Sequence, residues 1–160
     1  MKILFTAFYG KNNSSRILIN NIDPKIGDKL ALKNSFVTSV KELIKYIDTE
    51  DYDLIVSFGQ RPIGKNKIFL ELTATYQGKS YKTDFNYDLL FEKLKINGYD
   101  VKKSNDCGDW YCNYLYYEGL KYIKENNKNI SMIFIHLPKI KNIDSISKLT
   151  RVMNDYFSSF

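Results

Sequence analysis

Apolar residues along the chain follow two spacings, one typical of strands and one typical of helices. Several short runs are almost continuously apolar and rich in β-branched and aromatic residues, as buried strands are. The predicted strands are residues 2–8, 53–58, 67–74, 99–102 and 130–135. Elsewhere the apolar side chains recur every three or four positions, which predicts amphipathic helices. The predicted helices are residues 35–47, 87–96, 111–124 and 144–157.

Turn-forming residues separate these segments. The polar stretch 10–15 predicts a loop, and Gln77-Gly78-Lys79 predicts the turn of a hairpin. Asn97-Gly98 is a helix stop signal, and Asp144 or Ser145 is expected to cap the last helix. Alternating strands and helices indicate an α/β layer structure with a mostly parallel sheet. With no internal repeat and no linker, residues 1–160 are expected to form a single domain.

Length and composition agree with a folded domain of this kind. The 160 residues are 44% hydrophobic, enough for one sizeable core. The N-terminus has a short apolar run without a small-residue cleavage site, and no apolar stretch approaches the length of a membrane span. We therefore expect a cytoplasmic protein that does not enter a membrane.

The charge distribution and the number of metal-ligating residues argue against a nucleic-acid-binding protein and against a structural zinc protein. The net charge is +6, but the lysines are scattered and no basic stripe or nucleic-acid motif accompanies them. No nucleic-acid partner is expected. With one histidine and two cysteines, the chain lacks ligands for the usual four-ligand structural zinc site. A disulfide between Cys107 and Cys112 is not expected in a cytoplasmic chain.

Two polar residues stand within or directly after apolar strands. His136, the only histidine, follows an apolar run and therefore lies at the carboxyl end of a strand, where parallel sheets place their sites. Glu71 shares a strand face with Phe69 and Thr73. Either Glu71 faces solvent on an edge strand, or it is buried and accepts a hydrogen bond from His136. A hydrogen-bonded structural role is the alternative for the histidine.

Cys112 opens the predicted helix 111–124. The positive end of a helix dipole lowers a thiol pKa, and free backbone N–H groups there can form part of an oxyanion hole. The alternative is a small buried apolar residue, which is the interpretation given to Cys107 because nothing places a base beside it. A thiol, an imidazole and a carboxylate are together the parts of a thiol-hydrolase site.

Several segments resemble the signature segments of the pyroglutamyl peptidase I family of cysteine peptidases. Residues 107–113 match the Ala-Gly-x-Tyr-x-Cys-Asn segment, with Cys107 in place of alanine and Trp110 in place of tyrosine, and residues 134–138 match Phe-Ile-His-Val-Pro, with Leu137 in place of valine. Residues 71–74 match Glu-Arg-x-Ala, with leucine in place of arginine. Residues 59–64 resemble Gly-Gln-Ala-Pro-Gly. At the N-terminus, residues 6–8 and 13–15 resemble Thr-Gly-Phe and Asn-Pro-Ser.

The resemblance implies a three-layer α/β/α sandwich with a mostly parallel mixed central sheet. It also implies removal of N-terminal pyroglutamate from peptides without a cofactor or metal, with Cys112 as nucleophile, His136 as acid and base, and Glu71 as orienter. Binding of substrate is expected of a further set of residues at the start of the chain and after the second long strand. These are Phe8, Tyr9, Asn13 and Gln60.

The chain also departs from the family pattern. The loop between Phe8 and Asn13 is short, so that the second aromatic of the pyroglutamate pocket is absent or replaced by Tyr9. The region between Glu71 and Cys112 is shortened, and the family's arginine near the oxyanion site has no match, with Lys79 or Lys82 as substitutes. Two alternatives stay open: a hydrolase of another small acyl amide or lactam, and a non-catalytic binding protein. Self-association is a family property that the shortened region leaves open.

Overall fold

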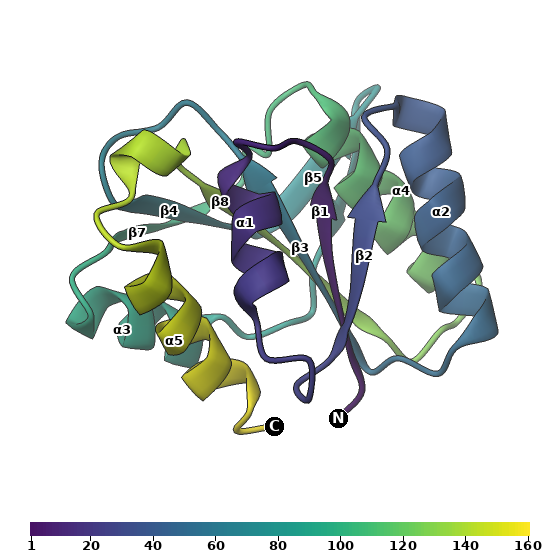
Figure 1. Ribbon diagram of the computed structural model, residues 1–160. Coiled ribbons are helices and arrows are strands. Elements are labelled where there is room, and N and C mark those ends of the chain that lie inside the picture. Colours follow the sequence, from purple (N-terminus) through teal and green to yellow (C-terminus); the bar gives the residue numbers. More distant parts are fainter.

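The computed structural model describes residues 1–160, which form an α/β structure in three layers (Figure 1). The central sheet has six strands in the order β2-β1-β3-β8-β4-β7. They are β1 (Ile3–Phe8), β2 (Asp28–Leu32), β3 (Leu54–Gln60), β4 (Lys67–Glu71), β7 (Asp100–Ser104) and β8 (Ser131–Leu137). Only the β4–β8 pair is antiparallel. The expected fold class, a sandwich with a mostly parallel mixed sheet, is confirmed.

Helices cover both faces of this sheet and enclose two apolar cores. On one face lie α1 (Ser14–Asn21), α3 (Asp88–Ile96) and α5 (Ile146–Phe157), whose apolar residues belong to one core. On the other lie α2 (Phe36–Thr49) and α4 (Tyr111–Glu125), which belong to the second core. Figure 1 shows α1 and α5 in front of the sheet and α4 behind it. A short 3₁₀ helix, η1 (Ile140–Asn142), follows β8.

Three of the five helices begin at a side-chain cap. The side chain of Ser35 accepts a hydrogen bond from the Thr38 N–H at the start of α2. Ser145, and not Asp144, does the same for α5, accepting from the N–H of Lys148. Such caps pair backbone donors that the first helical turn leaves free. The predicted boundaries of both helices therefore agree with the structure to within two residues.

Besides the short η1, one helix and one strand of the three layers were not predicted. Helix α1 begins at Ser14, inside the segment 10–15 that the sequence indicated as a loop, and β2 was not expected at all. Helix α1 has only eight residues, and its first two are buried serines, so it gives almost no helical period. Strand β2 begins with two polar residues, and only Leu30 and Leu32, which share one face of the strand, are buried in a core.

The apolar run 67–74 was predicted as one strand but forms two. Strand β4 ends at Glu71, and β5 (Thr73–Tyr76) leaves the sheet to pair with β6 (Lys79–Lys82) in a separate antiparallel hairpin. At its turn, Gln77 and Gly78 both have positive φ, 48° and 76°. Two such residues are the requirement of a type I′ hairpin turn, so the predicted turn is confirmed.

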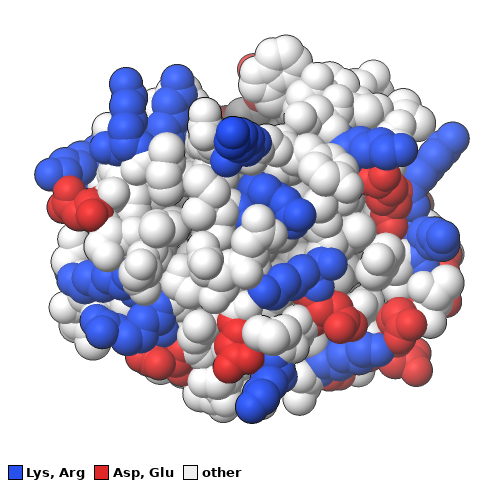
Figure 2. Space-filling model, in the orientation of Figure 1, with Lys and Arg blue, Asp and Glu red and all other residues white.

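The surface carries both signs of charge. Figure 2 shows lysine and arginine side chains spread over one face and interspersed with acidic side chains. None of the five helices is both long enough and apolar enough to cross a bilayer.

Candidate active site

The site is built where β3, β8 and β4 lie side by side. His136 is the second-last residue of β8, and its register partners are Gly59 of β3 on one side and Phe69 of β4 on the other. Glu71 lies two residues beyond Phe69 and therefore on the same face of the sheet as His136. Strand β4 lies between β8 and β7, so the alternative of an edge strand with a solvated Glu71 is wrong.

Glu71 and His136 form a buried pair. Nδ1 of His136 lies 2.7 Å from Oε1 of Glu71, and the two residues are 2% and 0% exposed. A carboxylate on Nδ1 fixes the imidazole tautomer that carries its proton there and leaves Nε2 free to accept one. The predicted hydrogen bond between these residues is therefore present.

Other groups hold Glu71 in place. The hydroxyls of Tyr87 and Tyr116 donate to its backbone carbonyl, at 3.1 and 3.0 Å. Nη1 of Arg61 lies 3.6 Å from Oε1 and donates to the backbone carbonyl of Asp106 at 2.8 Å. Arg61 thus links the buried carboxylate to the loop that precedes α4. A nearby cation lowers the cost of burying the Glu71 charge.

The thiol of Cys112 and the imidazole of His136 meet above Gly59. A Cβ built on Gly59 would lie 2.7 Å from Sγ of Cys112 and 3.0 Å from Cδ2 of His136, so these two atoms share the space above this glycine. Cδ2 is the ring carbon bonded to Nε2, the nitrogen that Glu71 leaves free. The absence of a side chain at Gly59 makes the approach of thiol and imidazole sterically feasible.

The predicted lowering of the Cys112 pKa is wrong. Burial raises the pKa of this thiol to about 12, and the Glu71 carboxylate adds to the rise. The backbone N–H of Cys112 and the Arg61 guanidinium act in the opposite direction but are outweighed. Desolvation disfavours the thiolate more than the helix N-terminus favours it, so the resting thiol is protonated at neutral pH.

Cys107 lies closer to the pair than its sequence indicated. Its Sγ, a carboxylate oxygen of Glu71 and a ring nitrogen of His136 are all within 4.8 Å of one another. The interpretation of Cys107 as a residue with no base beside it is therefore wrong, although it is buried as expected. Both cysteines are free.

The four residues predicted to bind substrate lie in different surroundings. Phe8 is buried at the end of β1, its ring 5.9 Å from that of Tyr111, the neighbour of Cys112. Tyr9 is 51% exposed and packs against Arg16. The side chains of Asn13 and Gln60 both accept hydrogen bonds from backbone N–H groups at the start of α1. The amide oxygens of both side chains are thus already paired in this state.

Two residues near the site were missed by the sequence analysis. Arg61 is the cation that contacts Glu71, whereas Lys79 and Lys82 are exposed on the hairpin strand β6. Tyr111 is the aromatic residue beside Phe8. Signals for both existed in the sequence, because Arg61 directly follows Gln60 and Tyr111 directly precedes Cys112.

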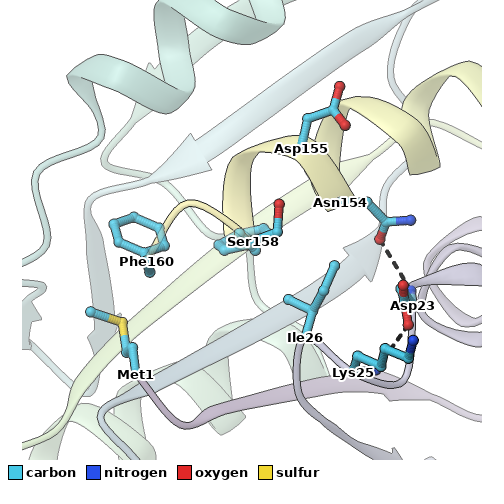
Figure 3. A pocket seen from close by; sticks show the side chains of 9 residues that line it. Met1, Asp23, Lys25, Ile26, Asn154, Asp155, Ser158 and Phe160 are labelled. Atoms are coloured by element: carbon cyan, nitrogen blue, oxygen red, sulfur yellow. Dashed lines mark hydrogen bonds between the residues drawn. The ribbon is translucent and has the colours of Figure 1, made fainter.

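A surface pocket at the other end of the molecule is separate from this site. Figure 3 shows that Met1, Ile26, Asn154 and Phe160 are among its lining residues. Met1 precedes the first residue of β1, while His136 lies near the carboxyl end of a parallel strand of the same sheet. The pocket contains none of the residues that surround His136.

Comparisons with known proteins agree with one another. The family model described as pyroglutamyl peptidase matches residues 76–152, a range that includes Cys112 and His136. Pyrrolidone-carboxylate peptidase 1 of Caldanaerobacter subterraneus subsp. tengcongensis is 30% identical over 86% of this chain and 82% of its own. The pyrrolidone-carboxylate peptidase of Brachyspira hyodysenteriae is 31% identical over 77% of this chain and 72% of its own.

Solved structures of low sequence identity share the fold. Pyroglutamyl peptidase I of Bacillus amyloliquefaciens superposes with a TM-score of 0.85 at 20% identity, covering 96% of this chain and 93% of that one. The pyrrolidone carboxyl peptidase of Fervidobacterium islandicum AW-1 superposes with a TM-score of 0.82 at 19% identity, covering 99% and 97%.

Proposed function

Because the chain belongs to the pyroglutamyl peptidase family, we propose that it removes N-terminal pyroglutamate from peptides as a cysteine-type exopeptidase. In this proposal Cys112 is the nucleophile, His136 the general base and acid, and Glu71 the residue that orients the imidazole. The observation that carries it is the Glu71–His136 hydrogen bond of 2.7 Å, with Cδ2 of the same ring and the Cys112 thiol both lying above Gly59.

The raised pKa of Cys112 determines how attack begins. A thiol with a pKa of about 12 is not a thiolate at neutral pH, so proton transfer to Nε2 of His136 accompanies attack on the scissile carbonyl. The imidazolium that forms is stabilised by the Glu71 carboxylate. It then donates its proton to the leaving amine, which gives a thioester and frees the shortened peptide. Water, deprotonated by His136, hydrolyses the thioester and releases pyroglutamate.

The N-terminus of α4 supplies donors for the oxyanion in this mechanism. No side chain caps α4, since Trp110 at the cap position makes no side-chain hydrogen bond to the first turn. Backbone N–H groups of a first helical turn have no intrahelical acceptor, and the dipole favours negative charge there. The same groups that fail to lower the resting thiol pKa to the neutral range are suited to stabilise the charge that develops during attack.

Aromatic side chains form the proposed lactam pocket. Phe8 and Tyr111 face each other beside Cys112, and Tyr111 also packs edge-on against Phe36, with ring centroids 4.6 Å apart. A lactam ring has apolar faces and polar edges, so it fits against such rings while backbone groups or Gln60 meet the edges. The proposed mechanism uses side chains and backbone groups alone and needs a reducing compartment to keep both thiols free, which agrees with the predicted cytoplasmic location.

The test is release of the fluorophore from pyroglutamyl-aminomethylcoumarin by the reduced protein. We expect turnover that Cys112→Ser abolishes and that His136→Ala lowers by about 10²–10⁴-fold, the usual contribution of a positioned acid–base residue. Matched circular dichroism spectra of the variants serve as the folding control. Most of the rate persisting in His136→Ala would falsify the mechanism.

A second candidate is a hydrolase of a different lactam or small acyl amide at the same three residues. It is favoured by the pairing of Asn13 and Gln60 with α1, because the amide oxygens of these two predicted substrate contacts already accept hydrogen bonds from backbone N–H groups. A panel of aminoacyl and lactam aminomethylcoumarin amides separates the two. Turnover of another amide in preference to the pyroglutamyl one supports the second. A non-catalytic binding protein would turn over none.

A further inference from the structure

Three side chains of different chemistry converge under the loop between β7 and α4. Sγ of Cys107, a carboxylate oxygen of Glu71 and a ring nitrogen of His136 all lie within 4.8 Å of one another. All three residues are buried, with Cys107 4% exposed. The proposed hydrolysis uses Glu71 and His136 but has no role for this second thiol. In the family segment that residues 107–113 resemble, alanine stands at the corresponding position.

Glu71 has unused capacity to bind a ligand. Its Oε1 pairs with His136, whereas its Oε2 is buried and receives no hydrogen bond from any group of the chain. A buried carboxylate oxygen without a partner is costly, and a bound cation is one means of satisfying it. This orphaned oxygen is an observation independent of the clustering of the three residues.

The donor set matches one class of ion. A thiolate, an imidazole and a carboxylate are the ligands of borderline-soft divalent cations, and of Zn²⁺ above all, whereas Mg²⁺ and Ca²⁺ take oxygen ligands. Zinc–ligand bonds of about 2.0–2.3 Å in a tetrahedron place ligand atoms about 3.3–3.7 Å apart. The observed upper limit of 4.8 Å requires a closure of about 1 Å, and Cys107 lies in an irregular segment outside any helix or strand, which allows such a movement.

We propose that Glu71, Cys107 and His136 form a three-ligand binding site for Zn²⁺ or a similar divalent cation. The ion binds Nδ1 of His136, whose imidazole then carries its one proton on Nε2, and it binds the Glu71 carboxylate so that the orphaned Oε2 gains a partner. The Cys107 thiol releases its proton to solvent as the metal–sulfur bond forms. A water molecule or the Cys112 thiol completes the tetrahedron. The two negative ligands outweigh the Arg61 guanidinium, 3.6 Å from Glu71, which is the one cationic side chain in contact with the carboxylate.

Occupation of this site stops hydrolysis, a consequence that rests on the proposed function. The ion takes His136 and Glu71 away from Cys112, so that no base receives the thiol proton. The binding itself does not depend on the proposed function. Binding and activity are therefore measured separately.

Binding is tested by titrating the reduced protein with Co²⁺, which replaces Zn²⁺ and gives a thiolate-to-cobalt charge-transfer band. Three proteins are compared: wild type, Cys107→Ala and Cys112→Ser. We expect one equivalent of Co²⁺ to produce the band in wild type and in Cys112→Ser. In Cys107→Ala we expect affinity to fall by about tenfold or more, together with loss of the band. An unchanged titration of Cys107→Ala, or a band that disappears only in Cys112→Ser, overturns the proposal.

Inhibition is tested with Zn²⁺ in the fluorophore assay. The half-inhibitory concentration for Cys107→Ala is expected to exceed that of wild type by about tenfold or more, while the two proteins have similar rates without metal. Equal inhibition of both overturns the inhibitory role. If neither protein hydrolyses the substrate, the proposed function fails, and the cobalt titration still decides whether the site exists. Cys107→Ser, which keeps the volume of the side chain, replaces Cys107→Ala if the latter fails to fold.

Discussion

At the scale of single residues, the position of Glu71 has the largest consequences. A fully buried carboxylate needs partners, and here they come from His136 of β8 and Arg61 after β3, while the hydroxyls of Tyr87 and Tyr116 hold the backbone carbonyl of the same residue. Arg61 is the member of this set that reaches solvent, since about a quarter of its side chain is exposed. It also holds the loop before α4 through the Asp106 carbonyl.

Arg61→Ala is expected to lower kcat more than it changes KM, because Arg61 acts on the proposed catalytic pair through Glu71 and not on the substrate. The expected loss of stability is about 1–3 kcal/mol, at the lower end of that range because the guanidinium is partly solvated. Urea unfolding and steady-state kinetics measure the two effects.

Two further variants control this prediction. Arg61→Lys should restore part of kcat, because the charge returns without the planar fork of donors. Arg151→Ala removes an exposed arginine of α5 and should leave the kinetics unchanged and the free energy of unfolding within about 0.5 kcal/mol of wild type. A decrease in kcat for Arg151→Ala as large as that for Arg61→Ala contradicts the positioning role.

At the scale of elements, the site depends on how closely strands and a helix approach one another. Strand β3 passes His136 at Gly59, and the start of α4 brings Cys112 over the same position. Strand β4 ends at Glu71, whose backbone carbonyl accepts hydrogen bonds from two tyrosine hydroxyls in place of a neighbouring strand. The apolar run therefore continues as the separate β5–β6 hairpin. The Glu71 carboxylate of the site thus lies at the carboxyl end of β4.

Gly59→Ala is expected to abolish most activity. The added Cβ would lie 2.7 Å from Sγ of Cys112 and 2.7 Å from Cε1 of Phe134, closer than van der Waals contact allows. Either the thiol or the imidazole must move, and overpacking of this kind costs about 1–3 kcal/mol. Thermal unfolding and the fluorophore assay measure both effects.

Gly64→Ala is the matched control, since a Cβ there meets no atom within 4 Å. Activity and stability close to those of wild type are expected for it. Equal behaviour of the two alanine variants would show that the space above β3 is not needed by the thiol.

At the scale of the whole molecule, the two cores bury several groups that ionise only at high pH. Burial raises the pKa of Cys107 and Cys112 above the ordinary 9.0, and that of Tyr87 and Tyr116 above the ordinary 10.0. In each case desolvation is the main cause. The folded state therefore keeps protons that the unfolded chain loses at lower pH.

Stability is therefore expected to fall on the alkaline side. Groups with raised pKa contribute their full stability below the unfolded values of 9.0 and 10.0, and lose it as pH rises through the folded ones. The free energy of unfolding should stay level to about pH 8 and fall by about 1.4 kcal/mol per pH unit for each such group above its unfolded pKa. Urea midpoints between pH 7 and 11 measure it.

Two variants test which groups cause this decrease in the free energy of unfolding at high pH. Cys107→Ala should make the decrease shallower, because it removes one buried group. Tyr9→Phe should leave it unchanged, since this tyrosine is half exposed. A constant urea midpoint up to pH 11 contradicts the prediction.

Much of this protein is determined by the sequence alone. Local signals were sufficient for the long strands, for α2 to α5, for Ser145 as one of two expected caps of α5, and for the hairpin turn at Gln77 and Gly78, because periodicity and turn chemistry act over a few residues. Motif resemblance was sufficient to choose Cys112, His136 and Glu71 as candidates. The eight-residue helix α1 and the half-buried strand β2 have too weak a local pattern to be found in this way.

Tertiary structure decided the chemistry of the site. Which groups surround Glu71, that Cys107 lies within 4.8 Å of the pair, and that burial outweighs the helix N-terminus at Cys112 all depend on residues far apart in the chain. Desolvation depends on everything packed around a group, whereas the dipole of α4 belongs to one element. The helix dipole at Cys112 can therefore be inferred from the sequence, whereas the desolvation of its thiol is seen only in the folded molecule.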